Sequence, residues 1–296
     1  MTSARASVLT SGLALVRAIR PRQWLKNVLV LAAPAAAGIA FRYQVAAEVA
    51  VAVAAFILAS SGIYLVNDII DVEADRAHPT KRRRPVASGE LSARDASVAA
   101  GLLLAAGLIV SALLTWELLV VVALYESLLL VYCLGAKQVP LVELLIVASG
   151  FLLRAIGGGV ATGVVLTSWF LVAVGFGALF MVAGKRYSEK LLARDATAAI
   201  RPVLAYYDPA FLRFVWMLSA VVLVTTYALW AATVRQATPD PWSLASVVPL
   251  LLGVLRYAAW IDAGRAGEPE EVVLHDGVFL LLVAIWGVCF IAAVYF

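Results

Sequence analysis

A short stretch of this sequence, NDIIDVEADRAHPTKRRRP at residues 67–85, places four acidic side chains shortly before four consecutive basic ones. If the preceding helix continues through it, Asp68, Asp71 and Asp75 occupy positions i, i+3 and i+7 and share one helix face. Carboxylates stacked in this way repel one another and, at a helix C-terminus, oppose the macrodipole, so a bound cation would offset the cost. We therefore expect these aspartates to be catalytic metal ligands.

The metal expected at such a face is Mg²⁺. This ion prefers oxygen ligands and is commonly shared between one or two carboxylates and the phosphates of a substrate. Asn67 adds a neutral oxygen that can bind or orient a ligand, whereas Glu73 points away from the aspartate face. The basic run that follows, at residues 81–84, can neutralise phosphate oxygens that the metal does not hold. The stretch thus predicts a site for Mg²⁺ and a diphosphate.

A second interpretation of the basic run is topological. Lys and Arg clusters next to an apolar span commonly mark the cytoplasmic side of a membrane and need no further role. That interpretation explains the basic residues but not the three aspartates on one face. We favour the metal and diphosphate site for this reason.

The elements that position these residues must be membrane helices, since 64% of the 296 residues are hydrophobic and only 14% are charged. Apolar segments near the length that crosses a bilayer predict an all-α protein with nine transmembrane helices. These segments are residues 27–42, 46–66, 97–116, 118–135, 140–163, 167–184, 210–234, 243–261 and 272–296.

The distribution of charge predicts the topology. Of the 23 Lys and Arg residues, 20 fall in alternate connections between spans, which places the N-terminus in the cytoplasm and the C-terminus outside. We expect one membrane domain over 1–296, an amphipathic lead-in at 1–26, and cytoplasmic active-site loops at 67–96 and 185–209.

Composition also excludes some classes of protein. The basic residues lie on one membrane face without base-stacking aromatic residues among them, so the net charge of +4 favours lipid headgroups and a phosphorylated substrate over nucleic acid. The two histidines and two cysteines have no spacing typical of metal or redox sites. The oligomeric state stays open, and a homo-oligomer is compatible with the sequence.

The motif NDIIDVEAD resembles the NDxxDxxxD motif of the UbiA superfamily of intramembrane prenyltransferases, and HPTKRRRP resembles the segment that follows it there. With RPRQWLKN at 20–27 and GKRYSE at 184–189, the closest resemblance is to the members that transfer phosphoribosyl groups to decaprenyl phosphate. It covers essentially the whole chain and implies a UbiA-like fold with nine helices around a central cavity. It also favours Lys81 and Arg84 as the phosphate-binding members of the basic run.

The second large cytoplasmic segment departs from most of that superfamily. Where a second acidic motif is usual, this chain has a set of mainly basic and polar residues that suits anionic groups better than a second metal. We expect Lys185 and Tyr187 to be catalytic and the others to bind substrate. The set is Lys185, Arg186, Tyr187, Glu189 and Lys190.

Three further polar residues are candidates for substrate binding. Lys26 and Asn27 lie at the entrance of the first span, where they could instead reach lipid headgroups. Arg154 falls inside a span, where a charge requires a wet cavity or a partner, and Glu126 or Glu143 could be that partner.

The resemblance implies a Mg²⁺-dependent transfer of the 5-phosphoribosyl group from phosphoribosyl diphosphate to decaprenyl (polyprenyl) phosphate, which releases diphosphate and supplies arabinan precursors for a cell wall. The donor's 5-phosphate accounts for a cationic second segment, and a lipid phosphate needs no general base because it is already ionised. Two alternatives remain. One is a UbiA-type enzyme that uses a prenyl diphosphate donor and an aromatic or lipid acceptor, and the other is a transporter.

Overall fold

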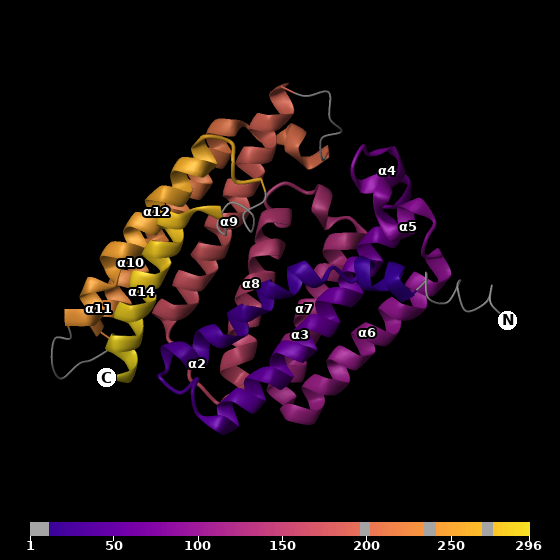
Figure 1. Ribbon diagram of the computed structural model, residues 1–296. Helices are drawn as coiled ribbons and strands as arrows, with labels where there is room; N and C mark the ends of the chain where they lie inside the picture. The colour runs from indigo at the N-terminus through magenta and orange to yellow at the C-terminus, as the bar shows by residue number, and fades with distance from the viewer. Residues whose placement is uncertain (1–11, 196–201, 234–240, 268–274) are drawn as a thin grey trace. The chain divides into compact units, whose positions relative to one another are not determined.

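The computed structural model describes residues 12–195, 202–233, 241–267 and 275–296, and these residues form helices and connecting turns without a β-strand (Figure 1). Residues 12–18 are helical and lead into the first of the bounded helices. In chain order these are η1 (Pro21–Leu31), α2 (Ala32–Ala36), α3 (Tyr43–Ile70), α4 (Val72–Ala77), η2 (Lys81–Arg83), α5 (Pro85–Ser88), α6 (Ala93–Leu114), α7 (Trp116–Leu134), η3 (Ala136–Gln138), α8 (Val142–Ala161), α9 (Ser168–Asp195), η4 (Pro202–Tyr206), α10 (Pro209–Thr233), α11 (Pro241–Ala245), α12 (Val247–Asp262) and α14 (Gly277–Tyr295).

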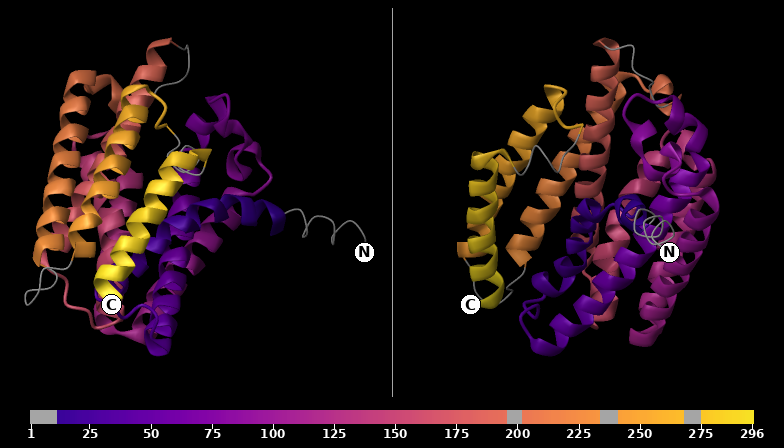
Figure 2. Two further views of the ribbon diagram at one scale, coloured as in Figure 1. Left: turned by 60° about the vertical axis from the view of Figure 1, so that its left-hand side comes forward. Right: turned by 45° about the vertical axis from the view of Figure 1, so that its right-hand side comes forward.

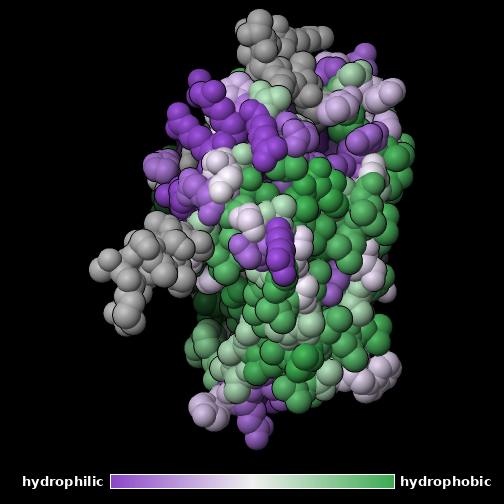
Figure 3. Space-filling view, turned by 90° about the vertical axis from the view of Figure 1, so that its right-hand side faces the viewer, coloured by the Kyte–Doolittle hydropathy of each residue, from purple (hydrophilic) through white to green (hydrophobic). Residues whose placement is uncertain are grey.

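Eight helical segments of the described chain are long and apolar enough to cross a membrane, which makes this a multi-pass membrane protein. They correspond to eight of the nine predicted spans. The outer face of α6 is an example of a surface suited to lipid, since the apolar side chains of Leu102, Ile109 and Leu113 are exposed on it. The space-filling view of this side is mainly hydrophobic through its middle, with hydrophilic residues concentrated at the upper end and smaller groups of them at the centre and the lower end (Figure 3).

The predicted span at 27–42 has a different form, because η1 starts at residue 21 and is a 3₁₀-helix rather than an α-helix. A 3₁₀-helix has three residues per turn, so every third side chain shares a face. The inward stripe is Trp24, Asn27 and Val30, and the exposed stripe is Leu25, Val28 and Leu31. Hydropathy alone does not distinguish this winding from an α-helix.

The described chain packs as two compact units. The first contains residues 12–34, 39–139 and 153–164, and the second contains residues 35–38, 140–152 and the described residues from 165 onward. Both contain non-contiguous segments, and α8 contributes to each, so the division does not separate successive domains. The prediction of one membrane domain over 1–296 stays a prediction.

In the first unit, α3 packs along α6 and also contacts α7 and η1. Its apolar core includes Phe56 and Tyr125, whose rings meet edge to face at 5.4 Å. In the second unit, α9 packs along α10, and α12 lies beside α14, as the two views of Figure 2 show. These packed helices are the rigid supports for the polar residues at their ends.

The two predicted cytoplasmic loops are largely helical. Residues 67–96 contain the end of α3, then α4, η2 and α5, and the start of α6. The segment that begins at Lys185 continues α9 as far as Asp195, because KRYSEKLLARD contains good helix formers and no Gly or Pro. Residues 196–201 of the second predicted loop lie outside the described residues.

The lead-in at residues 12–18 has two faces. Ala14 and Ala18 are buried in an apolar cluster with Leu65, whereas Leu13 and Val16 are exposed. This arrangement suits a helix at the membrane interface. Residues 1–11 of the predicted lead-in lie outside the described residues.

Candidate active site

The acidic motif lies where α3 ends. Its helix stops at Ile70, and Asp71 has φ −89° and ψ 7° before α4 begins at Val72. The expectation of one continuous helix through the three aspartates was therefore wrong. Backbone hydrogen bonds from Asp71 N to Asn67 O at 2.9 Å and from Asp75 N to Asp71 O at 2.8 Å span the break. Asp68 and Asp75 therefore still lie close enough to share one cation, Arg84.

Each of the three aspartates is paired with a cation from another segment of the first unit. Arg84 donates from Nη1 to Asp75 Oδ2 at 2.6 Å and to Asp68 Oδ1 at 3.2 Å. Arg20 also pairs with Asp68 Oδ1, and Lys137 pairs with Asp71 Oδ1. Arg84 thus lies beside the motif, and its partners there are the motif's own carboxylates. Its predicted binding of phosphate stays a prediction.

The carboxylates suit a hard cation, although the described residues contain no group of three His, Cys, Asp or Glu side chains close enough to hold one. Asp68 and Asp75 are buried, and Asp68 Oδ2 has no hydrogen-bond partner. A buried carboxylate oxygen without a partner is costly, and a metal would satisfy it. The donor set therefore fits Mg²⁺, and the assignment of Asp68, Asp71 and Asp75 as its ligands stays a prediction.

Sequence reasoning missed Arg20 and Lys137. Arg20 has a left-handed backbone (φ 55°) just before η1, and its guanidinium lies over the ring of Tyr64, 4.9 Å from the centroid. Lys137 lies on η3, in a short connection with no other charged residue. A single lysine in this connection is the only sequence feature that could have marked it as a site residue. The sequence does not reveal that it contacts Asp71.

Polar side chains within and just after the acidic motif form hydrogen bonds that hold the turns around it. Asn67 Oδ1 accepts from the thiol of Cys133 at 3.8 Å. His78 Nδ1 accepts from the backbone N–H groups of Thr80 and Lys81 at 3.3 and 3.4 Å. Burial, and then the positive charge of Lys81, lower the pKa of His78, which keeps this ring neutral at pH 7. A neutral ring is the form that can accept these bonds, so His78 shapes the start of the basic run.

Arg154 is buried in the first unit with polar partners. Its Nε donates to Asn27 Oδ1 at 2.7 Å and its Nη2 to the hydroxyl of Tyr125 at 2.8 Å, and its guanidinium lies 4.8 Å from the Tyr125 ring centroid. Glu143, one of the two carboxylates considered as its partner, pairs with Arg186 instead. Asn27 thus joins η1 to α8, while its Nδ2 has no hydrogen-bond partner.

In the second unit, Arg186 is part of a buried ion pair. Its Nε lies 3.0 Å from both oxygens of Glu143, its Nη2 is 3.0 Å from Glu143 Oε2, and its Nη1 donates to Glu189 at 3.0 Å. The side chains of Arg186 and Glu143 are only 4% and 1% exposed. This fork-shaped contact fixes α9 to α8.

We expect Glu143→Ala to lower the free energy of unfolding by about 3–5 kcal/mol, because it leaves the buried Arg186 charge without its main partner. The measurement is the melting temperature of the purified protein in detergent. Glu189→Gln is the matched control, since Glu189 is 22% exposed and its loss should cost at most about 1 kcal/mol. Equal shifts for both variants would show that burial does not set the strength of this pair.

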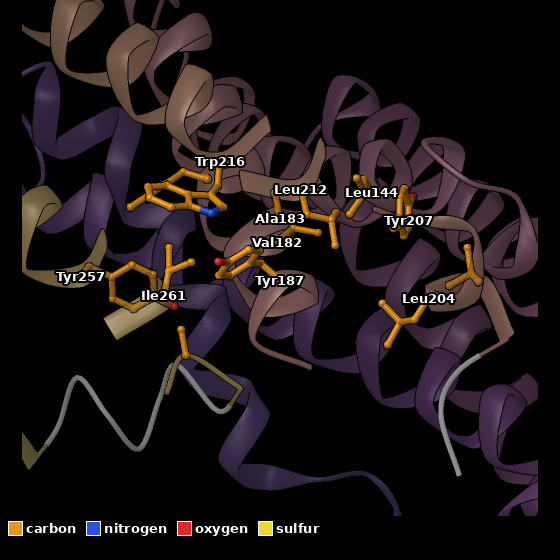
Figure 4. Packing of buried hydrophobic residues seen from close by; sticks show 13 residues of the cluster. Leu144, Val182, Ala183, Tyr187, Leu204, Tyr207, Leu212, Trp216, Tyr257 and Ile261 are labelled. Carbon is orange, nitrogen blue, oxygen red and sulfur yellow. The ribbon is translucent and has the colours of Figure 1, made fainter. Parts of the chain in front are cut away.

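The other candidates on α9 also have local contacts. Tyr187 lies in an apolar cluster beside Trp216 (Figure 4), and its hydroxyl accepts from Arg213 Nη2 at 2.6 Å. Lys190 donates to the backbone carbonyl of Leu204 at 2.6 Å, and Lys185 is half-buried on the same helix. Arg213, which also pairs with Asp262 at 2.8 Å, was not anticipated from the sequence. Substrate contacts of this group stay predictions.

Similarity to known proteins agrees with the motif and the helices. A relative in Mycolicibacterium smegmatis, named decaprenyl-phosphate phosphoribosyltransferase, is 49% identical over 97% of this chain and 94% of its own length. One of the same name in Corynebacterium glutamicum is 47% identical over 95% of this chain and 86% of its own length.

The fold has solved counterparts. One is a UbiA homolog from Archaeoglobus fulgidus bound to DMAPP and Mg²⁺, which superimposes with a TM-score of 0.71 at 18% identity. The superposition covers 95% of this chain and 98% of the homolog. Residues 28–283 match the UbiA prenyltransferase family. This chain belongs to the UbiA prenyltransferase family.

Proposed function

We propose that this enzyme transfers the 5-phosphoribosyl group of phosphoribosyl diphosphate to decaprenyl phosphate and releases diphosphate, in arabinan and cell-wall precursor synthesis. The observation that carries the proposal is the near-half identity, over almost the whole chain, to relatives named for this activity. Residues 185–190 are mainly basic and polar, whereas most members of the superfamily carry an acidic motif in this region. This difference also supports phosphoribosyl diphosphate as the donor.

The roles in the first unit follow from its chemistry. Asp68, Asp71 and Asp75 would hold Mg²⁺, which when bound neutralises charge on the diphosphate as it leaves. Lys81 and Arg84 supply further positive charge for phosphate oxygens. The buried, unpartnered Asp68 Oδ2 supports the metal assignment, and Asn67 would orient a ligand of the same site.

The reaction is a substitution at the anomeric carbon. An oxygen of the lipid phosphate forms a bond to ribose C1 while the bond from C1 to the diphosphate oxygen breaks, and diphosphate leaves with the bonding electrons. A cationic site stabilises the charge that develops on that leaving group. The lipid phosphate is already ionised near neutral pH, so no base must remove a proton. Inversion to the β anomer is what the resemblance implies.

The remaining candidates receive roles as part of the same proposal. Lys185 and Tyr187 would act on the ribose 5-phosphate, supported by the Arg213 contact that orients the Tyr187 hydroxyl. Lys26, Asn27 and Arg154 would bind substrate near η1. For Arg186, Glu189 and Lys190 we propose substrate binding as well, although their observed contacts hold α9 in place.

The orientation in the membrane is a proposal of the same kind. We infer a cytoplasmic N-terminus and active site and an external C-terminus, in the plasma membrane, because the basic residues gather in the connections on one side. A water-soluble donor would then reach the aspartates from the cytoplasm.

A donor competition tests the proposed function. Purified protein, Mg²⁺ and decaprenyl phosphate receive labelled phosphoribosyl diphosphate in one reaction, and a labelled prenyl diphosphate with an aromatic acceptor in another. We expect label to enter the lipid phase only from phosphoribosyl diphosphate. Transfer only from the prenyl donor would assign the chain to the alternative activity, and absence of turnover from either donor in detergent would favour a transporter.

A further inference from the structure

The acidic motif is neutralised by cations from three separate parts of the first unit. Arg20 precedes η1, Arg84 precedes α5, and Lys137 lies on η3 after α7. The side chains of Arg84 and Lys137 are only 25% and 17% exposed, so water screens their pairs less than it screens surface ion pairs. Three negative charges therefore face three positive ones at one site.

These pairs use the same atoms that a metal would use. Arg84 engages Asp75 Oδ2 and Asp68 Oδ1, and Lys137 engages Asp71 Oδ1. A divalent cation that binds those oxygens must displace the side-chain cations or share carboxylates with them. Like charges that approach in a half-buried site repel, so metal binding alone costs free energy.

A diphosphate removes this conflict, because its oxygens accept hydrogen bonds and charge from the displaced guanidinium and ammonium groups. We propose that Arg84 and Lys137 couple metal binding to diphosphate binding: each leaves its aspartate when the metal enters and then pairs with diphosphate oxygens. The free metal binds weakly, and the metal–diphosphate complex binds tightly. Lys137 is thereby a specificity-determining residue for metal-bound diphosphate over metal alone.

The proposal rests on the proposed function only in that the donor carries a diphosphate. A phosphoribosyl and a prenyl donor share this group, and both would release the same cations. The coupling can thus fail while the donor assignment holds, and the donor assignment can fail while the coupling holds.

The experiment measures binding of Mn²⁺, as a spectroscopic substitute for Mg²⁺, to the purified full chain in detergent. Electron paramagnetic resonance gives the dissociation constant of Mn²⁺ alone, and a second titration gives that of the Mn²⁺ complex of inorganic diphosphate. For the native chain we expect the complex to bind at least about tenfold more tightly than the free ion, which corresponds to about 1.4 kcal/mol of coupling.

Lys137→Gln should shift the two constants in opposite directions. Free Mn²⁺ should bind roughly fivefold more tightly, because its competitor for Asp71 is gone, and the diphosphate complex roughly fivefold more weakly, because an anion partner is lost. Arg84→Gln should do the same from a different segment, so a folding defect in one variant leaves the other as a test. Lys137→Arg should restore the native values.

Arg83→Gln is the matched control. Arg83 lies in the same basic run and carries the same charge, but it is exposed and pairs with no aspartate of the motif. We expect both of its constants to stay within about twofold of the native values. If Lys137→Gln and Arg83→Gln behave alike, or if Lys137→Gln and Arg84→Gln weaken binding of free Mn²⁺, the coupling is refuted.

Discussion

Asp68→Asn should lower the rate of phosphoribosyl transfer by roughly a thousandfold, the largest effect expected of a substitution in the acidic motif. Asn keeps the size of the side chain and one carbonyl oxygen, but it removes the negative charge that would hold Mg²⁺. Asp68 is 1% exposed and forms ion pairs with both Arg20 and Arg84, so its charge also offsets two cations. The measurement is the initial rate of label transfer over a range of Mg²⁺ concentrations.

Glu73→Gln is the control for this substitution. Glu73 lies between Asp71 and Asp75 in the sequence, but its side chain is 82% exposed and pairs with Arg76 at 2.8 Å. We expect its rate to stay within about twofold of the native rate, because an exposed pair of this kind contributes little. Substantial Mg²⁺-dependent transfer by Asp68→Asn would show that the metal does not depend on this carboxylate.

Gly158→Ala should destabilise the first unit by roughly 3 kcal/mol or more. A Cβ at this position would fall on the backbone carbonyl of Val30, 2.7 Å from its carbon atom. Backbone cannot rotate away as a flexible side chain can, so η1 and α8 would have to separate. The separation would also disturb the bond from Arg154 to Asn27. The measurement is the melting temperature in detergent and the yield of monodisperse protein.

Gly101→Ala is the matched control, because a Cβ there meets nothing within 4 Å and Gly101 lies within α6. Alanine is a better helix former than glycine, so this variant should be as stable as the native chain or slightly more stable. If both variants melt together, the close approach of Val30 to Gly158 is not a constraint on the fold.

The membrane helices and the position of the acidic motif could be predicted because both depend on local sequence. Long apolar runs identify eight of the spans. The resemblance singled out Arg84 as a phosphate-binding residue, and its pairing with the aspartates was not predicted. The ends of the helices could not be predicted from hydropathy. The break at Asp71 and the extension of α9 past Lys185 both fall in polar sequence, where the hydropathy pattern carries no signal.

The pairing of charges could not be predicted, because it depends on residues far apart in the chain. Lys137 and Asp71 are 66 positions apart, and Arg154 and Asn27 are 127 apart. Arg186 is the clearest example of a charge pair that the sequence does not reveal. A conspicuous arginine in a predicted substrate loop is held by the buried carboxylate of Glu143, and only tertiary packing could reveal that contact.

The winding of η1 affects the fit of the first helical segment to the bilayer. A 3₁₀-helix rises about 2.0 Å per residue and an α-helix about 1.5 Å. Residues 21–36, which form η1 and then α2, therefore extend over roughly 30 Å, but they would extend over only about 24 Å as one α-helix. The larger value equals the usual hydrocarbon thickness, and the smaller one would produce hydrophobic mismatch. The 3₁₀ winding thus gives this short segment the length that the predicted ninth crossing would need, and a thinner bilayer would favour its relaxation to an α-helix.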